Sequence, residues 1–89
     1  MYYMLISRTR KGLSAEEFQQ LGKLAQGFYD RIPAGLTLHG DWTANDRSCT
    51  FALLETGDAA LLERIQAPFR KYVDMEVIPV TPANGWNPQ

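Results

Sequence analysis

The stretch from Leu36 to Leu54 places the tightest limit on the fold, because two half-apolar runs flank a polar turn there. Asn45 and Asp46 separate the runs, a pattern typical of a β-hairpin. A two-residue loop at these positions and a four-residue loop over 44–47 lead to the same strand register. The only histidine and the only cysteine of the chain lie here. We therefore expect this hairpin to supply much of any chemical site.

The predicted register assigns the hairpin residues to two faces, because successive side chains of a strand point in opposite directions. The expected pairs are Trp42 with Cys49, Gly40 with Phe51, Leu38 with Leu53, and Leu36 with Glu55. That face is apolar with a single carboxylate at its end. His39 and Asp41 then share the opposite, more polar face.

Helix signals lie on both sides of the hairpin. Ser14 and Glu17 form a capping box at the start of the first helix. Apolar residues follow at three- and four-residue spacing, which predicts one buried stripe made of Phe18, Leu21, Leu24, Ala25 and Phe28. Asp58 can cap a second helix, and Pro68 either ends that helix or opens a separate short turn.

The order strand, helix, strand, strand, helix, strand predicts an α+β fold. The simplest such fold is the ferredoxin-like βαββαβ arrangement, with a four-stranded antiparallel sheet in the order 4-1-3-2. Pro79 cannot donate a ladder hydrogen bond, so the last strand, within 72–80, should lie at an edge. Residues 1–80 form a single domain in this interpretation, and 81–89 form a C-terminal tail that Trp86 alone is able to anchor.

The two central strands, 2–8 and 49–55, carry apolar side chains on both faces. Two helices cover only one face of a four-stranded sheet, and each large apolar group left exposed forfeits about 1.5–3 kcal/mol. We therefore expect a homodimer in which two identical sheets pack face to face.

Composition excludes several classes of function. Nine basic residues against ten acidic residues leave a net charge of -1, which argues against a nucleic-acid partner. A single cysteine cannot form an internal disulfide. The apolar run at residues 1–6 is too short for a signal peptide core or for a membrane span, so we expect a cytoplasmic protein without a membrane partner.

Two segments, 33–42 and 72–80, resemble an uncharacterised bacterial family known only as a domain of unknown function, family 3303. The likeness covers most of the chain, from Tyr3 to Val80. Two identical βαββαβ chains packed sheet to sheet also resemble the dimeric α/β-barrel superfamily. That superfamily includes cofactor-free monooxygenases, small-ring isomerases and haem-binding enzymes, so the resemblance does not choose a reaction. The residues 67–70 depart from the family pattern, which has an unbroken helix with a tryptophan there.

His39 and Glu55 are the candidate catalytic residues. His39 changes charge near neutral pH and is able to act as acid, base or ligand, or else simply meets water on an edge strand. Glu55 is a candidate acid or base if it points into a cavity, where loss of solvent raises the pKa of a carboxylate; otherwise it reaches water. Arg8 is expected either to pair with Glu55 or to hold an anionic substrate.

We place a small, mostly apolar pocket between the helices and the sheet of each subunit. Its predicted walls are Trp42, Phe51, Phe18 and Phe28, and its predicted polar contacts are Glu55, Tyr3 and Arg8. The leading hypothesis is a cofactor-free enzyme, of monooxygenase or isomerase type, that acts on a small organic compound. The alternative is a non-catalytic module for small-molecule binding or dimerisation.

One His and one Cys fall short of the ligands that a metal site requires, so we expect no metal, no haem and no other cofactor. Cys49 is predicted to be a buried, inert thiol.

Overall fold

In the computed structural model, which describes residues 1–83, two helices and four strands follow one another in the predicted order. The elements are β1 (Tyr2–Thr9), α1 (Ala15–Asp30), β2 (Leu36–Thr43), β3 (Thr50–Thr56), α2 (Ala59–Gln66), the short 3-10 helix η1 (Ala67–Phe69) and β4 (Val73–Val80). The antiparallel sheet has the order β2-β3-β1-β4, which is the predicted order read from the other end. The fold is therefore α+β and ferredoxin-like. The prediction for Trp86 lies outside the described residues.

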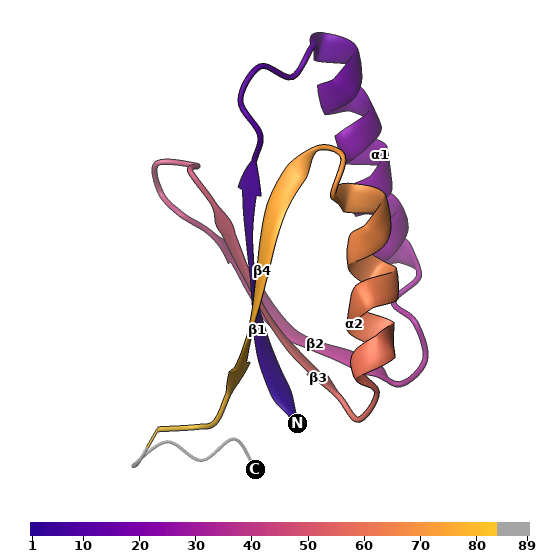
Figure 1. The fold of residues 1–89 in the computed structure, drawn as a ribbon, viewed down its shortest axis with the longest axis vertical. Coiled ribbons are helices and arrows are strands. Elements are labelled where there is room, and N and C mark those ends of the chain that lie inside the picture. The colour runs from indigo at the N-terminus through magenta and orange to yellow at the C-terminus, as the bar shows by residue number, and fades with distance from the viewer. Residues whose placement is uncertain (84–89) are drawn as a thin grey trace.

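Both helices lie on the same side of the sheet, and the other face of the sheet carries no helix (Figure 1). We call that other face the open face. The buried core lies between the sheet and α2, and its members are Leu5, Leu36, Leu54, Leu61 and Leu62. No helix among residues 1–83 is both long and apolar enough to cross a membrane.

The local signals in the sequence act as predicted. The Ser14 hydroxyl accepts a hydrogen bond from the Glu17 N–H, and the Glu17 carboxylate accepts one from the Ser14 N–H, which completes the capping box of α1. Asp58 caps α2 by accepting from the Ala60 N–H. Pro68 falls in η1, directly after α2 ends, and Pro79 lies in the edge strand β4.

The predicted hairpin register is wrong. Trp42 lies opposite Phe51 rather than Cys49, and Gly40 lies opposite Leu53. The connection is longer than expected, because β2 ends at Thr43 and β3 begins only at Thr50. Within it, the backbone N–H of residue 44 donates to the carbonyl of residue 49 at 2.9 Å. This bond closes a wider turn, which shifts the pairs near it by two residues.

A β-bulge lies between Leu38 and Gly40 in β2. The extra residue places His39 and Asp41 on opposite faces of the sheet, although both were predicted on one face. His39 instead shares the open face with Trp42. A Cβ built on Gly40 would lie 3.0 Å from Cη2 of Trp42, so the Trp42 ring, and not Phe51, covers the bare backbone there.

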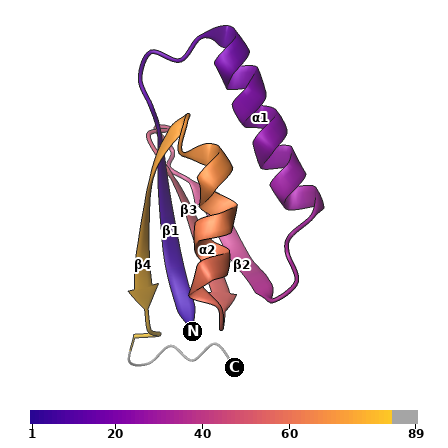
Figure 2. The same ribbon diagram turned by 45° about the vertical axis from the view of Figure 1, so that its right-hand side comes forward.

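Helix α1 is less buried than its apolar stripe predicts. None of its residues is buried, and 53% of Phe18 is exposed. In Figure 2, α2 lies along the sheet while α1 stands farther from it. The stripe is therefore only partly buried, with Phe28 packed against the core, and the expectation of a buried stripe on α1 is wrong.

The difference in burial predicts unequal costs of truncation. Leu54 is only 1% exposed, so Leu54→Ala should lower the free energy of unfolding by about 2–5 kcal/mol in chemical denaturation. Leu24→Ala, in half-buried α1, is the matched control and should cost about 1 kcal/mol. Equal losses at the two sites would show that α1 packs as closely as β3.

Candidate functional site

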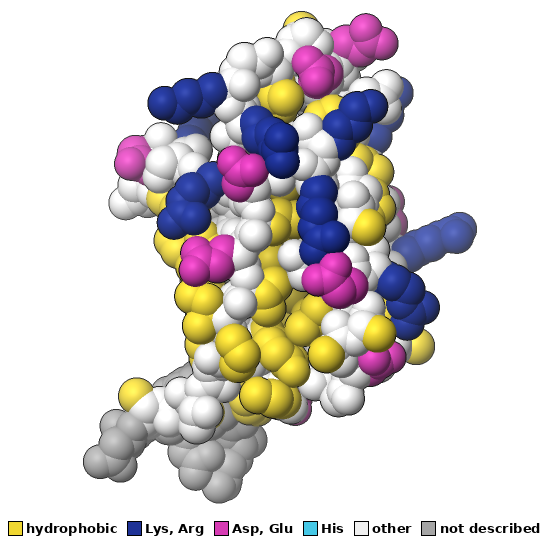
Figure 3. Space-filling model, in the orientation of Figure 1, with side chains coloured by type: hydrophobic (Ala, Val, Ile, Leu, Met, Phe, Trp, Pro, Cys, Tyr) yellow, Lys and Arg dark blue, Asp and Glu magenta, His cyan; other side chains and the backbone are white. Residues whose placement is uncertain are grey.

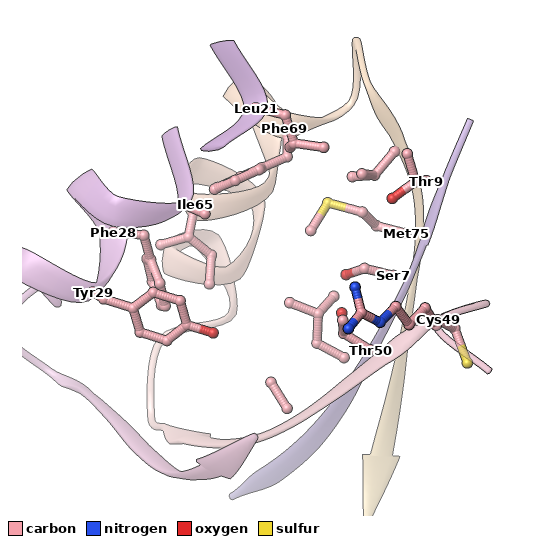
Figure 4. Close-up of a pocket in the computed structure, with 15 residues that line it drawn as sticks. Ser7, Thr9, Leu21, Phe28, Tyr29, Cys49, Thr50, Ile65, Phe69 and Met75 are labelled. Atoms are coloured by element: carbon pink, nitrogen blue, oxygen red, sulfur yellow. The ribbon is translucent and has the colours of Figure 1, made fainter. Parts of the chain in front are cut away.

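A cavity of about 250 Å³ lies beneath α1, between this helix and the sheet. It lies over the half of the sheet near the hairpin loop. Most of its lining is aliphatic or aromatic, and Figure 4 shows these side chains reaching in from both helices and from the sheet. The lining residues are Leu5, Ser7, Thr9, Leu21, Ala25, Phe28, Tyr29, Arg47, Cys49, Thr50, Ala52, Ile65, Phe69, Val73 and Met75.

The sheet contributes three hydroxyl-bearing side chains to the cavity, those of Ser7, Thr9 and Thr50. Ser7 of β1 lies directly opposite Thr50 of β3 in the register, so their hydroxyls are neighbours on the helix-facing side of the sheet. Figure 4 shows Ser7 and Thr50 across the cavity from Phe28 and Tyr29. The cavity therefore has an aromatic side on α1 and an opposite side that carries the Ser7 and Thr50 hydroxyls.

Tyr29 joins α1 to the sheet. Its hydroxyl donates a hydrogen bond to Oδ2 of Asp41 on β2. This hydrogen bond, partial burial and the nearby negative charge raise the pKa of Tyr29 from its ordinary 10.0 to about 12. Tyr29 is consequently a neutral phenol at physiological pH, and its bond to Asp41 holds the C-terminal end of α1 against an edge strand.

The two candidate catalytic residues lie away from this cavity. On the open face, Nε2 of His39 lies 2.8 Å from Oε1 of Glu55, and the His39 ring lies 5.5 Å from the Tyr2 ring, centroid to centroid. Tyr2 and Glu55 are direct register partners. The structure thus brings His39 and Glu55 together, but it turns neither of them into the cavity.

The other predicted pocket residues are also placed differently. The open face carries Trp42, Phe51 and Arg8. Arg8 pairs there with Glu76 at 3.8 Å rather than with Glu55.

Tyr3 faces the helices, and its hydroxyl donates to Sδ of Met1 at 3.4 Å. Neither Tyr3 nor Phe18 lines the cavity. Of the four predicted walls, Phe28 alone lines this cavity.

Several cavity residues were missed. Tyr29 lies four residues after Ala25 and beside Phe28, so the helical period places it near the stripe. Ser7 and Thr9 alternate with Leu5 along one face of β1. These two periodicities were signals that pointed to the cavity. Nothing in the sequence pattern marks Arg47, which enters the lining from the hairpin loop.

Cys49 is half-buried and free, and it lines the cavity from the loop end rather than from a strand. Among residues 1–83, no group of three or more His, Cys, Asp or Glu side chains is placed to hold a metal ion. A second hollow, of about 330 Å³, lies on the open face. It is lined by Tyr2, Met4, Trp42, Leu53, Val80, Thr81, Pro82 and Ala83.

The comparisons with known proteins agree with this fold. The family model described as Domain of unknown function (DUF3303) matches residues 1–86. The chain belongs to this family. The resemblance found in segments 33–42 and 72–80 is thereby confirmed.

Among solved structures, this DUF3303 chain is similar to SCO4226 from Streptomyces coelicolor A3(2), with a TM-score of 0.54 and 15% sequence identity. The likeness covers 93% of this chain and 99% of that one. At this identity it shows the fold alone. No curated protein matches the sequence.

The Tyr29–Asp41 bond predicts a pH-dependent stability. Because the folded protein holds the Tyr29 proton up to a pKa of about 12, the bond stabilises the fold fully below pH 10.0, and this contribution falls as the pH rises toward 12. Ultraviolet titration of tyrosinate should therefore show one late-ionising tyrosine. In Asp41→Asn that residue should ionise earlier, whereas an unchanged titration would contradict the bond.

Proposed function

We propose that this DUF3303 protein is a homodimeric binding module that holds one small, mostly apolar organic molecule in the cavity of each subunit. The cavity beneath α1 is the observation that carries the proposal. Its volume of about 250 Å³ exceeds the roughly 150 Å³ at which an apolar protein cavity binds benzene. Its size and lining fit a single ring with a small substituent.

The ionisable groups of the cavity favour binding over catalysis. A cofactor-free isomerase or monooxygenase needs a base within hydrogen-bond reach of its substrate. His39 and Glu55, the candidate acid or base residues predicted from the sequence, lie on the open face, away from the cavity. Tyr29 lines the cavity, but its phenol is protonated near neutral pH, so it donates a hydrogen bond and does not serve as a base there.

A cofactor-free enzyme remains the second candidate, and the Tyr29–Asp41 pair favours it. Asp41 is able to take a proton through the Tyr29 hydroxyl, which touches the cavity. Chemical change of a bound probe, detected by mass spectrometry and abolished in Tyr29→Phe, would favour the enzyme. A bound probe recovered unchanged favours the binding module.

The open face supports the homodimer. It presents large apolar side chains on all four strands, and 57% of Trp42 is exposed. These side chains are Tyr2, Met4, Ile6, Trp42, Phe51, Leu53, Ile78 and Val80. In the view of Figure 3, hydrophobic side chains reach the surface in the lower part of the molecule.

A domain of this size buries only about 60% of the surface of its extended chain. Burial of further apolar surface against a partner therefore adds more to its stability, in proportion, than it would for a larger domain. A second copy of the same apolar face supplies matching chemistry through a two-fold axis. We place this dimer in the cytoplasm, because the chain has a single cysteine and cannot form the internal disulfide bonds that are typical of proteins in oxidising compartments.

Two isoleucines of equal exposure test the dimer. Ile78 on the open face and Ile32 in the connection after α1 are each 39% exposed. Light scattering at micromolar concentration should give twice the chain mass for the wild type and for Ile32→Glu. Ile78→Glu should shift the mass toward the monomer, because it places a charge in the interface. A wild-type monomer would rule out the dimer.

A cavity-filling pair of variants tests the binding site. Indole and toluene should raise the melting temperature of the wild type and of Ala60→Phe, whose site lies exposed on α2. Ala25→Phe fills the cavity from α1 and should abolish this shift. A ligand at a hundred times its Kd stabilises by about 2.7 kcal/mol, which is easily measured. No shift with millimolar probe would remove support for the binding function.

A further inference from the structure

We propose that the ligand of the cavity is a small amphipathic acid, with a ring-sized apolar body and one carboxylate that Arg47 binds. This inference rests on the binding function proposed above and names its ligand class. The charge of the lining decides the class. Among residues 1–83, Arg47 is the only Lys, Arg, Asp or Glu that lines the cavity, and the nearby Asp41 carboxylate is already bonded to the Tyr29 hydroxyl.

Arg47 also has no carboxylate partner, a property that it shares with Arg31 among residues 1–83. Within residues 1–83, four other arginines form ion pairs, namely Arg8–Glu76, Arg10–Asp74, Arg64–Asp58 and Arg70–Glu63. Arg47 forms none there. Its neighbour Asp46 instead interacts with Ser48, whose side chain and then whose N–H, donating at 2.9 Å, lower the pKa of Asp46. The Arg47 guanidinium is thus available for an anion, and its planar fork matches a carboxylate.

The backbone at Arg47 is held in one conformation by a hydrogen bond within the hairpin loop. Arg47 has a φ of 62°, in the left-handed region that residues other than glycine seldom adopt. Its N–H donates to the Ala44 carbonyl at 2.8 Å, which holds this conformation within the loop. Backbone strain of this kind is often retained where it orients a functional side chain.

Neighbouring hydroxyls complete a polar end. Ser7 and Thr50 are register partners that line the cavity, and Thr50 follows Arg47 by three residues. Their O–H groups are able to donate to a second carboxylate oxygen. Across the cavity, Phe28 and Tyr29 offer an aromatic surface (Figure 4). An acid therefore fits with its carboxylate toward the hairpin loop and its ring toward α1.

Calorimetric titration with two matched probes tests this inference. Phenylacetate and phenylacetamide share a ring and a shape, but only phenylacetate carries a charge. We expect the wild type to bind phenylacetate about tenfold more tightly, as a charge-assisted hydrogen bond predicts. Arg47→Gln should remove that preference, so that the variant binds the two probes with equal affinity. The control Arg70→Gln, outside the cavity, should change neither affinity.

The outcomes separate the two proposals. Equal binding of both probes by the wild type, blocked by Ala25→Phe, would overturn the acid and leave the binding function standing. A preference for phenylacetate that survives Arg47→Gln would overturn the assignment of Arg47. Failure of both probes to bind would overturn the binding function and this inference together. Arg47→Lys keeps the charge without the fork, and should retain part of the preference.

Discussion

The structure depends on the unequal covering of one sheet. β1 and β3 carry large apolar side chains on both faces, while both helices lie on one face only. Even on that face the cover is partial, because α2 packs on the core and α1 contributes no buried residue. The domain therefore has two incompletely covered apolar surfaces, the cavity under α1 and the open face. The two proposals, a bound molecule and a second subunit, each follow from one of them.

The β-bulge at β2 decides which side chains meet which surface. With one extra residue between Leu38 and Gly40, Asp41 turns toward α1 and bonds to Tyr29, while His39 turns to the open face and bonds to Glu55. A regular strand would leave His39 and Asp41 on one face and Tyr29 without its acceptor. The bulge thus places His39 and Asp41 on opposite faces of the sheet, where each bonds to a different partner.

The sequence predicted the features that depend on local chemistry. Ser14, Asp58 and Pro68 act at helix ends through their own backbone neighbours, and Pro79 limits β4 through its missing N–H. The hairpin register was beyond such reasoning, because polar and apolar residues alternate alike with or without a bulge. The cavity was also hidden, because a helical stripe has the same period whether it touches the sheet or stands away from it.

The two edges of the sheet carry a further consequence. Unpaired strand edges invite addition of strands from other molecules, which leads to open-ended aggregates. Here β4 lacks an N–H at Pro79, and β2 is interrupted by its bulge at His39, so neither edge offers an unbroken ladder. Growth through the edges is therefore disfavoured, whereas contact through the open face is not. Such a protein can present much apolar surface and still stop growing at a finite size.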